Sequence, residues 1–294
     1  MAGGILQAPH TSVIALQQQS VAMHSMDMTM LDITIAGVSA VGTAFALQSH
    51  LIFGRPTRIR PLVQGPYQGT YGVTALRLKT PDGAVLEGWC SRPLDGRVDR
   101  IVLYFGGRNE NVAWVPHMAS HNPAAVFYAF NYRSFGSSTG VPSEARSKID
   151  SYSISSFIRH REPELPHLEL VYMGRSLGTA LALWLSRDIR PHRMVLMSPF
   201  PSLPALLSSR HGCSLLIPLL RQHFDCNPLA DGFPGKSLVL LAENDTLIPH
   251  SASLSLAQRF ALPPTVEVIA GTNHKTLPRH LSAQAAISSF LAEA

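Results

Sequence analysis

The sequence lacks the features that several large functional classes need. It has only three cysteines among 294 residues, Cys90, Cys213 and Cys226, and no C-x-x-C pair. Such a sparse, odd set builds neither a disulfide framework nor a cysteine-based zinc site. We therefore expect small buried thiols in a reducing compartment, with a Cys213–Cys226 bridge as the alternative if that segment folds back on itself.

Charge is also scarce. Charged residues make up 15% of the chain, its net charge is +5, and no run of five like charges occurs. A mildly basic surface is the simplest interpretation, and nothing points to a nucleic-acid partner. No G-x-x-x-x-G-K-[ST] loop is present to cradle phosphates, and no His/Cys cluster has metal spacing. We expect no cofactor and no metal.

Residues 1–54 contain neither lysine nor arginine. An apolar stretch covers 33–47 and reaches residue 53 if a short polar break is accepted, against the ~20 apolar residues that a membrane span needs. A weak membrane anchor and a packed or amphipathic helix over 31–53 both remain open. A cleaved signal is disfavoured because no positive segment precedes the stretch. Arginines at 55, 58 and 60 would place the following domain of an anchored chain in the cytoplasm.

The rest of the chain, 61–294, is expected to form one α/β domain. Residues 71–80 and 85–91 flank a Pro-Asp-Gly turn and predict an antiparallel hairpin. Short apolar runs then alternate with longer segments of helical length, which is typical of a mostly parallel, doubly wound sheet. The runs are 101–105, 126–130, 168–173, 194–197, 237–241 and 266–270, and the helices are expected over 144–161, 177–187, 251–260 and 276–292. Residues 199–234 interrupt the alternation and predict a small cap.

The strongest local pattern is Gly174-Arg175-Ser176-Leu177-Gly178, between an apolar run and a helical segment. A serine on a sharp strand-to-helix turn needs neighbours with almost no side chain, and two glycines supply them. The helix that follows turns free N–H groups toward developing negative charge. The pattern predicts that Ser176 is a nucleophile.

A serine hydroxyl needs a base, and the base needs a group that orients it. Asp245 follows the run 237–241, and His274 follows the run 266–270, so both are expected at the edge of the sheet that carries Ser176. The order Ser, Asp, His is the one that this kind of triad uses. Glu243 is the rival acid, and His250 is expected to open a helix instead.

A tetrahedral intermediate also needs two N–H donors. The backbone N–H of Leu177 is expected to be one. The second is expected from the loop after 101–105, where the N–H of Arg108 is the first candidate and that of Gly107 the second.

Together, FGGRNEN, NYRSFGSSTGVPSE, GRSLG, AENDTLIP and GTNH resemble the α/β-hydrolase superfamily, over residues 70–293. They look most like its short-capped serine hydrolases, which include esterases, acyl-thioesterases and prolyl-oligopeptidase-like peptidases. In such relatives the Tyr-Arg pair, Tyr132 and Arg133 here, supports the loop beside the site. Relatives often have His at the position of Gly106 and Gly at that of Ser134. The first difference is expected to loosen the oxyanion loop. The second places a side chain in a tight turn that usually lacks one.

The resemblance implies cleavage of an ester or thioester through an acyl-enzyme, with a small-molecule or acyl substrate. Apolar residues in the cap segment would suit an acyl chain or core packing equally well: Leu203, Leu206, Leu207, Leu215, Leu216 and Ile217. One alternative is a peptidase that uses Glu110 or Arg175 to hold a charged terminus. The other is a non-catalytic scaffold, since a fold alone does not give a function. The oligomeric state is not encoded in any pattern we find.

Overall fold

The computed structural model describes residues 48–54, 65–67, 70–208 and 214–293. The chain divides into two units, Met1–Gln48 and Ser49–Ala294, and the account below concerns the second. The expected segment 31–53 therefore lies largely outside the described residues, and so does the expected domain boundary at residue 60. No helix within the described ranges combines the length and the apolar character that crossing a membrane requires.

The described strands form one sheet in the order β1-β2-β3-β5-β4-β6-β7-β8-β9. Their bounds are β1 Gly65–Tyr67, β2 Tyr71–Lys79, β3 Val85–Pro93, β4 Arg100–Phe105, β5 Ala125–Phe130, β6 Glu169–Arg175, β7 Arg193–Met197, β8 Lys236–Ala242 and β9 Thr265–Ile269. Strands β1, β2, β3 and β5 pair antiparallel, and β5, β4, β6, β7, β8 and β9 pair parallel. The predicted hairpin, the predicted parallel series and the mostly parallel sheet are confirmed.

The helices connect these strands. The α-helices are α2 Glu144–Arg161, α3 Leu177–Ser186, α4 Leu203–Ser208, α5 Asn227–Ala230, α6 His250–Ala257 and α7 Leu281–Ala292. The 3-10 helices are η1 Val112–His121, η2 Leu165–His167, η3 Ser214–Leu219 and η4 Leu277–Arg279. Residues 48–53 are also helical. The four helices expected from sequence are present, although the segment 276–292 is split into η4 and α7.

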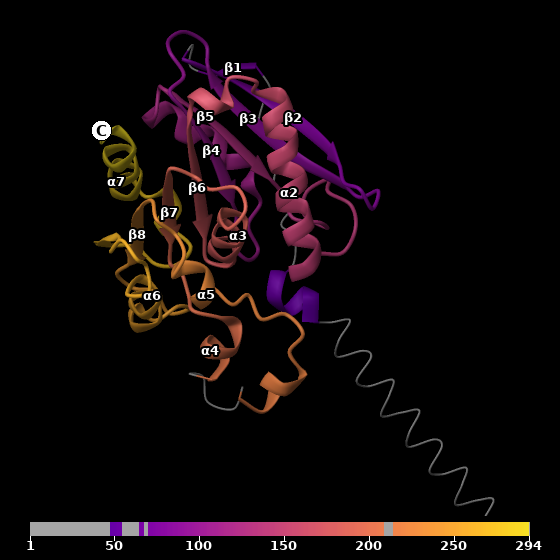
Figure 1. Cartoon of the computed structure of the whole chain (residues 1–294), viewed down its shortest axis with the longest axis vertical. Coiled ribbons are helices and arrows are strands. Elements are labelled where there is room, and N and C mark those ends of the chain that lie inside the picture. The colour runs from indigo at the N-terminus through magenta and orange to yellow at the C-terminus, as the bar shows by residue number, and fades with distance from the viewer. Residues whose placement is uncertain (1–47, 55–64, 68–69, 209–213, 294) are drawn as a thin grey trace, which may run out of the picture. The chain divides into compact units, whose positions relative to one another are not determined.

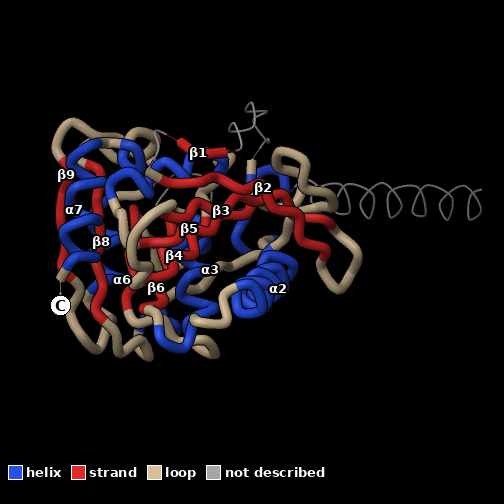
Figure 2. Tube along the Cα trace, turned by 90° about the horizontal axis from the view of Figure 1, so that it is seen from above, coloured by secondary structure: helices blue, strands red, loops and turns tan. Residues whose placement is uncertain are grey.

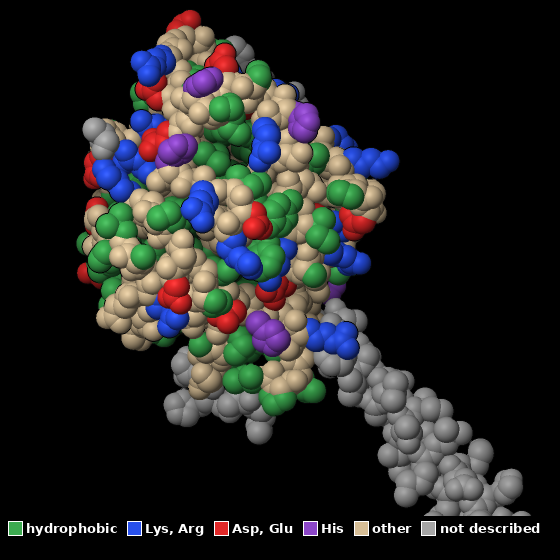
Figure 3. Space-filling model, in the orientation of Figure 1, with side chains coloured by type: hydrophobic (Ala, Val, Ile, Leu, Met, Phe, Trp, Pro, Cys, Tyr) green, Lys and Arg blue, Asp and Glu red, His purple; other side chains and the backbone are tan. Residues whose placement is uncertain are grey.

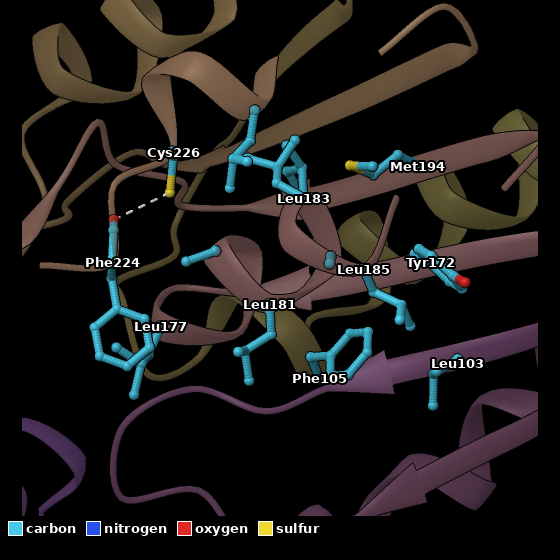
Figure 4. Close-up of a cluster of buried hydrophobic side chains, with 14 of the residues drawn as sticks. Leu103, Phe105, Tyr172, Leu177, Leu181, Leu183, Leu185, Met194, Phe224 and Cys226 are labelled. Carbon is cyan, nitrogen blue, oxygen red and sulfur yellow. Dashed lines mark hydrogen bonds between the residues drawn. The ribbon is translucent and has the colours of Figure 1, made fainter. Parts of the chain in front are cut away.

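The sheet is covered on both faces because its central strands are apolar on both sides. In β4, Ile101, Leu103 and Phe105 belong to the core layer shared with α2, α3, α5 and α6. Val102 and Tyr104 belong to the opposite layer, shared with η1 and α7. Helices α2 and α3 lie together on one side of the strands (Figure 2). Figure 4 shows the α3 leucines packed beside Phe105, Tyr172 and Met194.

Strand β9 departs from the expectation of a run buried on both faces. Val266 is 38% exposed and Val268 is 53% exposed. The strand pairs only with β8 and forms the edge of the described sheet, so its outer side chains meet solvent.

The segment 199–234 contains the short helices α4, η3 and α5, drawn in orange beneath the strands in Figure 1. Phe200, Phe224 and Phe233 of this segment are at most 2% exposed and pack into the core. Leu203 and Leu206 pack against the same core, so core packing accounts for these two side chains. That the segment caps a site stays a prediction.

The cysteines behave as the composition indicates. Cys90 and Cys226 carry free, buried thiols. Burial raises the pKa of both thiols, so they are poor nucleophiles at neutral pH. Because Cys226 is free, the alternative bridge to Cys213 is not formed; Cys213 itself lies outside the described residues. On the face in Figure 3, basic side chains are scattered among acidic and uncharged ones.

Candidate active site

Parallel strands bring their carboxyl ends to one edge of the sheet, and the candidate residues follow four such ends, those of β4, β6, β8 and β9. Ser176 lies between β6 and α3 with φ 49° and ψ −116°, a backbone conformation that a residue with a side chain rarely adopts. Its N–H donates to the carbonyl of Met197 at 2.8 Å, and its carbonyl accepts from the N–H of Thr179 at 2.9 Å and from the hydroxyl of Thr179 at 2.6 Å. These bonds hold the turn in its strained form.

The flanking glycines are required by close backbone approach. A Cβ at Gly174 would lie 2.7 Å from the carbonyl oxygen of Gly178 and from the Cα of Thr179. A Cβ at Gly178 would overlap the carbonyl oxygen of Phe105 at the end of β4. The turn therefore packs directly against the loop that was expected to supply an oxyanion donor.

His274 and Asp245 come together from loops 29 residues apart. His274 Nδ1 lies 2.8 Å from Asp245 Oδ2, and their side chains are 10% and 1% exposed. The other carboxylate oxygen, Oδ1, accepts from the N–H groups of Leu247 and Ile248, each at 2.9 Å. Ser198, which follows β7 with φ 46°, donates its hydroxyl to Oδ2 at 2.8 Å.

These contacts decide the charge of Asp245. Burial raises the pKa of its carboxyl, but the hydrogen bonds from His274, the Ile248 N–H and Ser198 outweigh burial and lower the pKa to about 2. An ionised carboxylate only accepts hydrogen bonds, so Nδ1 of His274 is the donor and Nε2 of a neutral imidazole is left as the acceptor. This is the tautomer that a general base needs.

The rival acid and the rival histidine lie elsewhere. Glu243 is exposed and accepts from the Gly271 N–H at 2.9 Å. His250 is the first residue of α6, as predicted, and its Nε2 contacts the carbonyl of Ala242 at 2.7 Å. Asp245, not Glu243, is the carboxylate beside His274.

Ser176 and His274 are linked through Arg175. Nη2 of Arg175 donates to the main-chain carbonyl of His274 at 2.7 Å, and Nη1 donates to Glu110 Oε2 at 2.8 Å. The serine hydroxyl forms no hydrogen bond with His274 or with any other group in the described part of the chain. Such contacts are often long in free enzymes and shorten when substrate binds.

The loop after β4 is built around the buried Glu110. Its Oε2 accepts from the Gly107 N–H at 2.6 Å, and its Oε1 accepts from Tyr104 and Trp114 at 2.9 Å each. Burial opposes ionisation, but Arg175 and the Gly107 N–H hold the pKa of Glu110 below its usual value. The sequence pattern gave no sign of this ion pair.

This geometry separates the two candidates for the second oxyanion donor. The Gly107 N–H is already donated to Glu110, so it is engaged in this structure, which favours Arg108 over Gly107. The Arg108 N–H donates to no group in the described residues. Leu177 is the first residue of α3, and first-turn N–H groups have no partner within a helix. Leu177 and Arg108 remain the candidates.

The Glu110–Arg175 pair also bears on the peptidase alternative. Both residues are 7% exposed and use their charges on each other. Because the two charges pair with each other, the structure gives no support to a role for either in holding the terminus of a peptide.

The loop after β4 is supported by Tyr132, one of the two residues for which the resemblance implies this role. The Tyr132 hydroxyl donates to the carbonyl of Gly106 at 2.6 Å. Arg133 joins Asp82 in the first hairpin to Asp150 in α2 at 2.6 and 2.7 Å. A Cβ at Gly106 would lie 2.8 Å from a methyl of Val112, so this glycine suits its tight surroundings rather than loosening the loop.

Ser134 shows how a side chain is accommodated in the turn. Its φ is 66°, and its hydroxyl donates to the carbonyl of Gly140 at 2.5 Å. The hydrogen bond offsets part of the cost of the left-handed conformation.

Among the described residues, no group of three or more His, Cys, Asp or Glu side chains is arranged to hold a metal ion. No family model matches the sequence. The chain is 27% identical over 199 residues to the uncharacterized protein Rv2307c of Mycobacterium tuberculosis, covering 67% of this chain and 70% of that protein.

Solved structures decide the fold. The esterase Pf2001 of Pyrococcus furiosus aligns with a TM-score of 0.62 at 17% identity, over 81% of this chain and 96% of the esterase. An alpha-beta serine hydrolase homologue from Coxiella burnetii aligns with a TM-score of 0.54 at 14% identity, over 74% and 97%. The chain has the α/β-hydrolase fold. In this α/β-hydrolase fold, Ser176, Asp245 and His274 follow β6, β8 and β9, three strands that end at one edge of the sheet.

Proposed function

We propose that the protein is a serine hydrolase that cleaves carboxylic esters or thioesters through an acyl-enzyme. The observation that carries the proposal is the buried Asp245–His274 hydrogen bond, which lies at the strand edge that also holds the strained Ser176 turn. The esterase likeness supports the same class of reaction.

In the proposed reaction, Ser176 Oγ attacks the carbonyl carbon of the substrate while its proton passes to Nε2 of His274. Asp245 keeps the imidazole in the required tautomer and stabilises the imidazolium that forms. The oxyanion accepts hydrogen bonds from the N–H groups of Leu177 and Arg108.

The intermediate collapses as the C–O or C–S bond breaks, and His274 gives its proton to the leaving alcohol or thiol. Water then attacks the ester on Ser176 while His274 takes a proton from it. Release of a carboxylic acid returns that proton to Ser176, so the enzyme ends unchanged. Each step uses only groups that the loops after β4, β6, β8 and β9 supply.

The nature of the substrate is proposed from the surroundings of the site. We infer a small-molecule or acyl substrate bound beneath the segment 199–234. A membrane association through 31–53, with the catalytic domain in the cytoplasm, would suit acyl substrates; most of that segment lies outside the described residues.

A fluorophosphonate probe tests the proposal, because it reacts with activated serines. We expect one adduct, on Ser176, in the wild-type protein and none in Ser176→Ala or His274→Ala. Ser255→Ala and His121→Ala change an exposed serine and an exposed histidine outside the site and should label normally. A folded wild-type protein that takes up no probe would favour a non-catalytic scaffold. If the probe does label Ser176, a panel of esters and thioesters defines the substrate.

A further inference from the structure

The helical residues 48–53 end against the loop that carries the proposed oxyanion donor. The last carbonyl groups of a helix have no partners within it. Here two of them are satisfied by that loop: the Phe53 carbonyl accepts from the Asn109 N–H at 2.9 Å, and the Leu51 carbonyl accepts from Arg108 Nε at 3.0 Å. The helix end and the loop therefore complete each other's hydrogen bonds.

The side chain of Phe53 adds a third connection. It is fully buried and stacks edge-to-face on Tyr132 at 5.3 Å and on Phe224 at 5.9 Å. Tyr132 is the residue whose hydroxyl holds the carbonyl of Gly106 at the start of the same loop. Ser49, nearer the start of the helical residues, accepts from Gln222 at 3.4 Å, which joins the helix to the segment 199–234.

Gly54 ends the helix at very close range to the loop. Its φ is +88°, its N–H donates to the carbonyl of His50 at 2.9 Å, and a Cβ there would overlap the side-chain amide of Asn109. Asn109 itself has φ 60°, a conformation that local hydrogen bonds must hold. The residues on either side of the Arg108 N–H are thus fixed by Gly107–Glu110 and by Asn109–Phe53.

We propose that residues 49–54 are a positioning element for the oxyanion donor: they hold the backbone at Arg108 and Asn109 in the form that the transition state needs. This inference rests on the proposed hydrolase function. Residues 49–54, which are remote in sequence from the triad, would then affect kcat. They would act through their contacts with the loop and would not touch the substrate.

The test compares two glycines with nearly equal φ angles. Gly54→Ala and Gly83→Ala both place a side chain at a φ near +87°, but nothing lies within 4 Å of a Cβ at Gly83. We expect Gly54→Ala to lower kcat and the rate of fluorophosphonate labelling ~10-fold or more with KM changed by only about twofold, as misplacement of an oxyanion donor does. Gly83→Ala should keep kcat within about twofold of the wild type.

A double-mutant cycle identifies the route. Asn109→Gly removes the amide that the added methyl group would strike and suits the positive φ, so Gly54→Ala should change kcat by less than about twofold in that background. Arg108→Met, which keeps the backbone N–H and loses only the bond to Leu51, should lower kcat ~3-fold or more without a matching fall in melting temperature. This variant decides the question if Gly54→Ala does not fold.

If the wild type is active, either of two results overturns the positioning role alone. In one, Gly54→Ala has the same kcat as Gly83→Ala; in the other, Arg108→Met keeps full kcat. A folded wild type that neither labels nor hydrolyses any ester overturns the proposed function and this inference with it.

Discussion

Arg175 donates a 2.7 Å hydrogen bond to the main-chain carbonyl of His274, so the residue next to the proposed nucleophile holds the loop of the proposed base. The same guanidinium pairs with Glu110, whose carboxylate holds the Gly107 N–H. One buried arginine therefore ties together the loops after β4, β6 and β9, and the mutual geometry of the site depends on it.

Removing Arg175 should harm both stability and activity. Arg175→Met leaves Glu110 buried without its partner, which is expected to cost about 3–5 kcal/mol in the free energy of unfolding. It also frees the His274 loop, so kcat/KM should fall by about 100-fold. Urea unfolding and ester turnover measure the two effects.

The double variant Arg175→Met with Glu110→Gln separates them. Without a buried charge it should recover most of the lost stability, while kcat/KM stays low because the bond to the His274 carbonyl is still missing. Recovery of full activity together with stability would show that Arg175 acts only through folding.

Asp245→Asn should preserve the packing of the site and switch the imidazole of His274 to the other neutral tautomer. An amide can donate to Nδ1, which places the proton on Nε2, where the base must accept. We expect kcat to fall by 10³–10⁴-fold, on the order found for this change in a serine protease. Glu243→Gln is the matched control on the same loop and should keep normal kcat, since Glu243 does not contact His274; an equal loss in both variants would refute the assignment of the acid.

The depressed pKa of Asp245 predicts a pH dependence of stability. The carboxyl ionises near pH 2 in the folded protein and near its usual 3.8 in the unfolded chain. Between these values the unfolded chain binds more protons, so stability rises with pH. The contribution is complete above pH 3.8 and is lost as pH falls toward 2.

Urea midpoints of wild type and Asp245→Asn, measured from pH 6 down to the acid limit of folding, isolate this group. The stability difference between the two proteins should shrink as pH falls below about 4. A difference that stays constant through that window would mean that the hydrogen bonds do not lower the pKa of the Asp245 carboxyl in the folded protein.

The backbone strain at Ser176 should lower the free energy of unfolding by a measurable amount. At φ 49° and ψ −116° a glycine adopts the backbone conformation without steric cost, whereas an alanine is strained by its Cβ. Ser176→Gly is therefore expected to be more stable than Ser176→Ala by about 1 kcal/mol, with both inactive. Thermal unfolding compares them directly, and equal melting temperatures would mean that the turn carries no strain.

Much of the fold follows from local sequence. The apolar runs and the glycine and proline punctuation predict the strands of the described sheet from β2 to β9, and the G-x-S-x-G pattern predicts the turn at Ser176, because these signals act over a few residues. Order along the chain, together with the rule that parallel strands end at one edge, predicts that Asp245 and His274 meet.

Other parts depend on contacts between distant segments. The Glu110–Arg175 pair joins positions 65 residues apart, and Ser198 reaches Asp245 across 47. A charged residue beside a motif is equally consistent with a substrate ligand, which is the role that the peptidase alternative gives Glu110 or Arg175. The exposure of β9 also escapes prediction, since an edge strand carries valines much like those of a central one.

The most direct test of the account is to trap the acyl-enzyme. The wild-type protein is mixed with excess p-nitrophenyl ester, quenched in acid during turnover and digested. The mass of the peptide that contains Ser176 is then measured by mass spectrometry. The account predicts that this peptide gains the mass of the acyl group in the wild type, and that the gain is absent in Ser176→Ala. Turnover of the ester by Ser176→Ala at the wild-type rate, or an acyl group on another residue, would contradict it.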